Sequence, residues 1–266
     1  MCKCLYSREL RGGTKRDPSL TAKFVNRYEK DLLKMIKEAR KEIIELLRGR
    51  VVKKEMAEWT IDIKTFRETL SRIINIIFRE PATQTGNDVI TEQAQRGVMR
   101  ADQFLAQAGI TAYIGGMPID PNVLDILQER NLTGLMGIAD DMERRIIQDV
   151  STGILNGDGA AEIGRSIEES IGVSESQAMR IARTETMTAF NQASTDRYKQ
   201  FGIDEVVWRT GGSNICTYVK GFDGVVYNGG CMGLNGEIFG IDAAPPVPLH
   251  PNCKCILQPV IERVGK

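Results

Sequence analysis

The sequence has 266 residues, with 35 lysines and arginines against 35 aspartates and glutamates, and 42% of its residues are hydrophobic. This length allows one large domain or two ordinary ones, with a core that needs no cross-links for stability. The most apolar run, residues 73–78, is far shorter than the roughly 18 residues that a membrane span needs, which excludes an integral membrane protein.

The first residues, MCKCLYSRELR, are charged and lack the apolar segment of a secretory signal. We therefore expect a reducing cytoplasm, with Cys2 and Cys4 as plain thiols. Residues 1–54 contain 16 lysines and arginines against 7 acidic residues, so the positive charge is concentrated at this end. A solvated helix face explains this excess, and the alternative is nonspecific contact with a nucleic-acid backbone or with an acidic protein.

The N-terminal half is predicted to be helical. Asp17-Pro18, an N-cap followed by proline, opens a long helix that ends at Gly49. Its apolar residues alternate three and four apart: Val25, Tyr28, Leu32, Met35, Ala39, Ile43 and Leu46. We call this row of apolar residues the seam and expect it to pack within the chain. Packing against a neighbouring subunit is the alternative. Two further amphipathic helices should end before Pro81 and at Gly109.

The middle of the chain continues the helical pattern. Asp120-Pro121 should open a short helix, and residues 135–155 should form another, closed by the loop 156–159. A helix from Ala160 should end at Gly172. The capping-box sequence that begins at Ser174 should then open a helix that runs to Phe201.

Beyond Gly202 the apolar runs shorten among many glycines, which is typical of short strands. The candidate strands are residues 206–208, 216–219, 225–227 and 255–257. We therefore predict an α+β fold, in which a mostly helical N-terminal two thirds precedes a small, irregular β-rich C-terminal module. The expected domains are residues 1–157 and 158–266.

Glu185 falls on a stripe of small residues in the helix after Ser174. The other members of this stripe are Ala178, Ala182, Ala189 and Ala193. A carboxylate on such a face needs a partner from another element, and we expect backbone donors or the indole Nε1 of Trp208. A role as general acid or base would need a second catalytic group nearby, so a structural role is favoured.

The stretch PPVPLHPNCKC, residues 245–255, contains the only histidine of the sequence in an H-x-x-C-x-C pattern. Zinc binds thiolates and imidazole, usually through four protein ligands. The candidate ligands are Cys216, Cys231, His250, Cys253 and Cys255. Two alternatives remain open: a disulfide from Cys216 to Cys253 or Cys255, and a proline-stiffened turn with buried thiols. A Cys-His nucleophile pair lacks an orienting acid here, so we expect no catalytic centre.

The C-terminal part resembles the phage Mu F-like head morphogenesis family over residues 158–262. The residues that carry this resemblance are Ala182-Arg183-Thr184-Glu185, Asn191, Ala193, Tyr198, Gly202, Trp208, Cys216, Phe222-Asp223-Gly224 and His250-Pro251-Asn252-Cys253-Lys254-Cys255. The sequence departs from the family at Gly212, Asn214 and Val219, where aspartate, arginine and a second cysteine are frequent. Cys231 is the candidate substitute for that missing thiol.

The resemblance implies a minor head protein of a tailed phage or prophage, and not an enzyme. Such proteins associate with the portal, assist head assembly and genome packaging or ejection, and reside in the virion, at the capsid interior or portal vertex, after assembly in the host cytoplasm. The partners implied are the portal protein and other head proteins. The alternatives are a toxin-like nuclease or transferase that uses Glu185 with Arg183 or the Cys/His cluster, and a DNA-binding accessory protein that uses residues 1–54.

Overall fold

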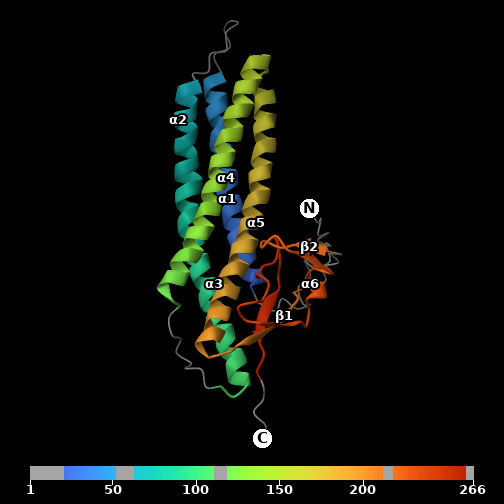
Figure 1. Cartoon of the computed structure of the whole chain (residues 1–266). Coiled ribbons are helices and arrows are strands. Elements are labelled where there is room, and N and C mark those ends of the chain that lie inside the picture. The colour runs from blue at the N-terminus through green and yellow to red at the C-terminus, as the bar shows by residue number, and fades with distance from the viewer. Residues whose placement is uncertain (1–20, 52–62, 111–118, 212–217, 262–266) are drawn as a thin grey trace. The chain divides into compact units, whose positions relative to one another are not determined.

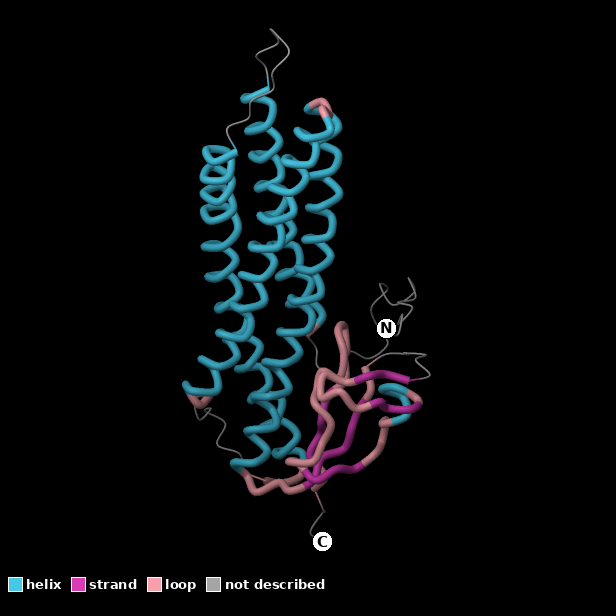
Figure 2. Tube along the Cα trace, turned by 45° about the horizontal axis from the view of Figure 1, so that its top comes forward, coloured by secondary structure: helices cyan, strands magenta, loops and turns pink. Residues whose placement is uncertain are grey.

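The computed structural model describes residues 21–51, 63–110, 119–211 and 218–261. Its helices are α1 (Ala22–Val51), α2 (Ile63–Ile74), the π-helical η2 (Asn75–Arg79), α3 (Glu80–Gln107), α4 (Pro121–Asn156), α5 (Ala160–Gln200) and the short α6 (Gly230–Gly233). The strands are β1 (Glu205–Arg209), β2 (Tyr218–Lys220), β3 (Val226–Asn228), β4 (Ile238–Gly240) and β5 (Ile256–Pro259). Figures 1 and 2 show long helices followed by short strands, which confirms the predicted α+β class. Within the described part of the chain, no helix has both the length and the hydropathy to cross a bilayer.

The chain packs as two units. One contains Arg27–Asn87 and Arg130–Ile181 and is helical; the other contains residues up to Asn26, Asp88–Glu129 and Ala182–Lys266 and includes every strand. The loop between α4 and α5, residues 157–159, is the place of the predicted domain boundary. That boundary at residue 157 stays a prediction.

The helical unit is built from parts of α1, α2, α4 and α5 (Figure 1). The seam predicted on α1 is buried in this unit at Tyr28, Leu32, Ala39 and Ile43, with Ile36 and Leu47 in place of Met35 and Leu46. The buried apolar residues of the other helices in this unit include Phe66, Leu70, Ile74, Leu135, Met142, Ile146, Ile163, Ile167 and Ile171. The seam therefore packs within the chain, as favoured from the sequence.

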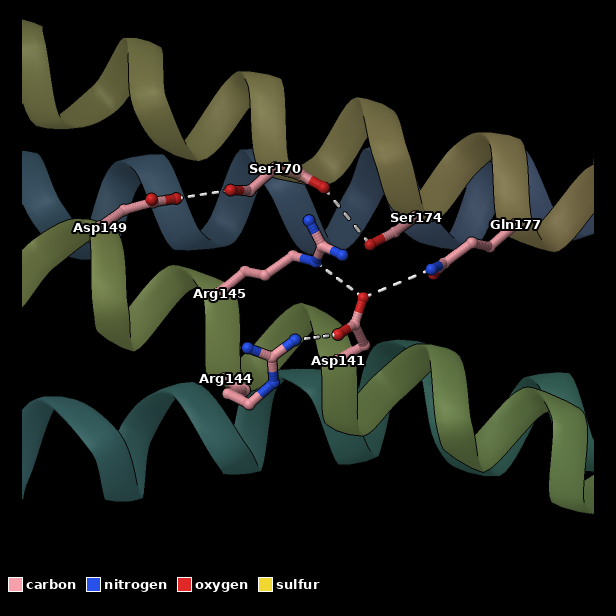
Figure 3. A network of polar contacts seen from close by, with 7 residues as sticks. All are labelled: Asp141, Arg144, Arg145, Asp149, Ser170, Ser174 and Gln177. Carbon is pink, nitrogen blue, oxygen red and sulfur yellow. Dashed lines mark hydrogen bonds and ion pairs between the residues drawn. The ribbon is translucent and has the colours of Figure 1, made fainter.

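Polar contacts also join α4 to α5 within this unit (Figure 3). Asp141 accepts hydrogen bonds from Arg144, from Arg145 Nε at 2.7 Å and from Gln177 Nε2 at 3.3 Å. Burial acts to raise the pKa of the Asp141 carboxyl, but the hydrogen bonds from Arg145, Arg144 and Gln177 outweigh it and lower that pKa. Asp141 is therefore an anion at neutral pH, and its contact with Gln177 links α4 to α5.

Three predicted helix breaks are wrong. Pro81 lies at the second residue of α3, directly after η2, and the chain is helical on both sides of it. The wider π-helical turn accommodates the proline ring and its missing N–H. Gly172 lies inside α5, and α4 is one helix from Pro121. Burial of Ile167 and Ile171 outweighs the roughly 1 kcal/mol that an internal glycine costs.

The strands form two small antiparallel sheets (Figure 2). The first has the order β4-β1-β5, with Val207 opposite Ile238 on one side and opposite Gln258 on the other. The second is the β2-β3 hairpin, with Val219 opposite Tyr227. Strands β1, β2, β3 and β5 overlap the predicted ones, whereas β4 was not predicted. Residues 216–217 of the predicted second strand lie outside the described residues.

The positive excess of residues 1–54 lies mostly outside the described part of α1. Residues 22–47 contain seven lysines and arginines against five acidic residues. Several of these charges are paired on the helix surface, as in Lys34–Glu38 and Arg40–Glu168. DNA contact through residues 1–54 stays a prediction.

A glycine at the crossing of α3 and α5 offers a test of this packing. A Cβ on Gly97 would lie 2.2 Å from the Phe190 carbonyl oxygen, and Ser194 Oγ donates to the Gly97 carbonyl at 3.0 Å. We expect Gly97→Ala to lower the free energy of unfolding by about 1–3 kcal/mol, because the helices must move apart. The measurement is chemical denaturation followed by circular dichroism.

Gly137→Ala in α4 is the matched control, because a Cβ there meets nothing within 4 Å. It should be neutral or stabilising by up to about 1 kcal/mol, since alanine is the better helix former. Equal destabilisation by both variants would contradict the observed crossing of α3 and α5.

Candidate metal centre

The C-terminal module is anchored on the second half of α5. The predicted stripe is buried here, with Ala182 and Ala189 fully buried and Ala193 2% exposed. Ala189 and Ala193 pack against α3 and α4, with Ile90, Ala94 and Leu127. β5 contacts α5 through Ile256, which packs with Met187 and Phe190. Asn191 Nδ2 donates to the Cys255 carbonyl at 3.2 Å and to the Met187 carbonyl at 2.9 Å. The last strand is thus joined to α5 by a buried side chain.

A second contact links the helix signature to the histidine-containing turn. Arg183 Nη1 donates to Asn252 Oδ1 at 3.1 Å. Thr184 is buried, and among the described residues its hydroxyl has no hydrogen-bond partner. Arg183, and not Thr184, therefore makes the side-chain hydrogen bond to the turn.

Glu185 is half-buried on α5. Trp208 is fully buried in β1, and its Nε1 has no hydrogen-bond partner among the described residues. The expected bond between Glu185 and the indole is therefore wrong. Trp208 instead fills the apolar core of the module, with Tyr198, Val219, Leu249 and Leu257. Packing, and not polar pairing, explains the burial of this tryptophan.

Asp223 and Gly224 form the turn between β2 and β3. Asp223 Oδ1 accepts the Val225 N–H at 3.0 Å, and Gly224 has a φ of 83°, which favours glycine. Tyr227 OH donates to Asp223 Oδ2 at 2.5 Å. Burial and this hydrogen bond raise the pKa of Tyr227 to about 12, so the phenol keeps its proton at neutral pH. These residues shape an exposed hairpin.

The local sequence explains how His250 and Cys253 come together. The Cys253 N–H donates to the His250 carbonyl at 3.1 Å, which closes a four-residue turn. Pro251 and Asn252 are the two central residues, and Asn252 has a φ of 65°. Proline followed by an asparagine with positive φ is typical of a type II turn. The chain is extended after this turn, so Cys253 and Cys255 point to the same side.

Cys231 reaches the same place from α6. Thr210 Oγ1 donates to the Cys231 carbonyl at 2.7 Å, which fixes α6 against the end of β1. The sulfurs of Cys231, Cys253 and Cys255 all lie within 4.8 Å of one another, and the three side chains are buried. His250 Nε2 lies 3.1 Å from Cys231 Sγ. Three thiols therefore lie at one point, and the imidazole lies beside them in contact with Cys231.

Hydrogen bonds distribute the protons of this cluster unevenly. The bond between the Cys231 and Cys253 sulfurs, 3.9 Å apart, raises the pKa of Cys231 and lowers the pKa of Cys253. The hydrogen bond from Cys231 acts to lower the pKa of Cys255, but Cys253 and burial outweigh it and raise that pKa to about 12. Cys253 is therefore the thiol of the cluster that most readily becomes a thiolate, which is the form that binds metal.

The structure thus brings together four of the five predicted ligands: Cys231, His250, Cys253 and Cys255. The fifth, Cys216, lies outside the described residues, as do Cys2 and Cys4. Cys231, Cys253 and Cys255 are free thiols here. The predicted disulfide from Cys216 is not addressed by the described residues. Asn191 and Asn252 belonged to the pattern that suggested the family, but their anchoring role was not recognised from the sequence.

The contact between Asn191 and Cys255 can be tested by substitution. Asn191→Ala leaves the buried Cys255 carbonyl without its donor, which should cost about 1–3 kcal/mol of unfolding free energy. Gln192→Ala is the control, because the neighbouring Gln192 is exposed and bonds only to Asp196 among the described residues. That variant should change stability by less than about 0.5 kcal/mol. Indistinguishable denaturation curves for the two variants would contradict the anchoring role of Asn191.

Comparison with known proteins locates this module within a family. No curated protein and no solved structure matches the chain significantly. Residues 144–258 match the family model described as Phage Mu protein F like protein. The match begins within α4 and ends within β5, so it includes Arg183, Asn191 and the whole thiol and imidazole cluster. Residues 144–258 of the chain are therefore similar to the phage Mu protein F-like family.

Proposed function

We propose that this chain is a minor head protein of a tailed phage or prophage, which associates with the portal and assists head morphogenesis and genome packaging or ejection. The observation that carries the proposal is the family match over residues 144–258. The matched residues include the segment in which α5 holds the terminal strands. The protein would reside at the capsid interior or portal vertex, after assembly in the host cytoplasm.

The burial and the contacts of His250, the only histidine of the chain, support a structural role over a catalytic one. His250 is 7% exposed, and both of its ring nitrogens are engaged, one with Cys231 Sγ and the other with the Pro251 carbonyl. A general base must reach the proton that it removes from a substrate. Cys231, Cys253 and Cys255 are also buried. The cluster is therefore suited to holding the fold together.

The hairpin of the C-terminal module supports contact with a protein partner. Large apolar side chains are exposed on and beside β2, β3 and α6: Tyr218, Phe222, Val225, Val226 and Met232. Exposed apolar groups gathered on one small element are typical of protein interaction sites. We assign the portal to this surface, because the family role requires a stable contact with another head protein.

Co-sedimentation with the portal tests this function. The purified chain should migrate with portal oligomers of the same phage genome in a density gradient. Replacing Phe222 and Val226 together by aspartate should reduce the bound fraction at least about tenfold, because interface centres tolerate charge poorly. Both residues are exposed, so these changes should leave the fold intact.

Leu155→Asp is the matched control, because Leu155 is an exposed apolar residue on α4, 87% exposed. It should bind the portal as the unmodified chain does. Failure of the unmodified chain to co-sediment, together with its absence from purified particles, would contradict the proposed function. Equal loss of binding with Leu155→Asp would contradict the assignment to the hairpin.

A further inference from the structure

We propose that Cys231, His250, Cys253 and Cys255 bind one Zn²⁺ ion in a closed, structural site of the C-terminal module. The proposal rests on the convergence of these four side chains and does not depend on the phage function. All four lie in the unit that contains the strands. They come from two segments, Cys231 on α6 and residues 250–255 before β5.

The separations between the donor atoms suit a tetrahedral ion. Zinc bonds to sulfur are about 2.3 Å long, so tetrahedral ligands place their sulfurs about 3.8 Å apart. Here Cys231 and Cys253 sulfurs are 3.9 Å apart, and the Cys255 sulfur lies within 4.8 Å of both. The imidazole Nε2 is 3.1 Å from Cys231 Sγ. The imidazole nitrogen is not among the donor atoms that all lie within 4.8 Å of one another, so its ring must move toward the other sulfurs to complete the four-ligand site.

The histidine is already oriented as a ligand. Its Nδ1 lies 2.8 Å from the Pro251 carbonyl oxygen. Because a carbonyl can only accept, Nδ1 must carry the proton, and in neutral imidazole Nε2 then has a free lone pair. Metal-bound histidines usually donate their other N–H to such an acceptor, which fixes the tautomer and the ring. Pro251 therefore acts through its carbonyl as a positioning residue.

Backbone groups also contact the cysteine sulfurs, as the Pro251 carbonyl contacts the imidazole. The Gly211 N–H donates to the Cys255 sulfur, and the Cys255 N–H donates to the Cys253 sulfur. Gly211 approaches closely because it has no side chain: a Cβ there would lie 2.1 Å from the Lys254 carbonyl oxygen. Hydrogen bonds to metal-bound thiolates stabilise their charge. The proposed ligands thus have hydrogen-bond partners of their own, and the separations of their sulfurs suit a tetrahedral ion.

The donor set favours zinc in a structural role. Three thiolates and one imidazole are a known structural zinc combination, whereas magnesium and calcium prefer oxygen ligands. Four protein ligands leave no open position for substrate. Cys231 and His250 are 19 positions apart, so the ion would close the loop that contains β4 and join it to the segment before β5. Binding would therefore stabilise the module directly.

Metal content of the unmodified full-length chain, purified without chelators, is the first test. Elemental analysis should find about one zinc per chain. Replacing it with Co²⁺ should give sulfur-to-cobalt charge-transfer absorption and the strong visible bands of a tetrahedral site. Stripping the zinc should lower the thermal midpoint, and Zn²⁺ but not Mg²⁺ should restore it. A folded chain that retains no zinc and binds no Co²⁺ would overturn the proposal.

Ligand identity is tested by single substitutions. His250→Ala and Cys253→Ser should each weaken zinc binding more than about tenfold in a competition with a chromogenic chelator. Cys216→Ser is the matched control and should retain one zinc. If Cys216→Ser loses the metal while His250→Ala keeps it, this set of four ligands is wrong. If a ligand variant does not fold, the Co²⁺ spectrum of the unmodified chain still shows whether thiolates bind the metal in a tetrahedral site.

Discussion

The attachment of the final strand to α5 is the contact on which the C-terminal module depends. Asn191 donates a hydrogen bond to the Cys255 carbonyl, and Ile256 of β5 packs against Met187 and Phe190 of α5. Since β5 pairs with β1, and β1 pairs with β4, this one attachment fixes the three-stranded sheet relative to the helix. Arg183 adds a second link through Asn252. The small module thereby shares the rigidity of a long helix.

The same attachment positions the thiol and imidazole cluster. The turn that bonds to Arg183 also brings His250 beside Cys253, and the carbonyl that bonds to Asn191 belongs to Cys255. Anchoring and clustering therefore depend on the same six residues before β5. The same segment thus supplies both the link to α5 and three of the four side chains of the cluster. A cross-link within the module would add to the stability that its buried core gives, because it reduces the entropy of the unfolded chain.

The sequence was informative where a local pattern has one physical meaning. The H-x-x-C-x-C spacing pointed to His250, Cys253 and Cys255, which lie close together beside Cys231, and alternating apolar residues led to the buried face of α1. The sequence was misleading where tertiary packing decides where a helix ends. Pro81 and Gly172 were predicted as helix ends, but the helices continue through both residues, with a π-helical turn before Pro81 and buried residues before Gly172. Glu185 was expected to bond to backbone donors or to the Trp208 indole, whereas the links from Arg183 and Asn191 to the segment before β5 were not expected. Which polar residue makes such a link depends on the facing segment, and the pattern of one helix cannot reveal that.

Native-state hydrogen exchange tests the central claim, that the second half of α5 and the last strand form one cooperative unit. Exchange of the amides in β5 and in residues 182–200 should be followed at increasing denaturant concentration. We predict that both groups open with the same free energy and the same denaturant dependence, because Asn191 bonds to Cys255 and Ile256 packs against Met187 and Phe190. If β5 exchanges at low denaturant while residues 182–200 stay protected, the strand is only loosely attached and the account is wrong.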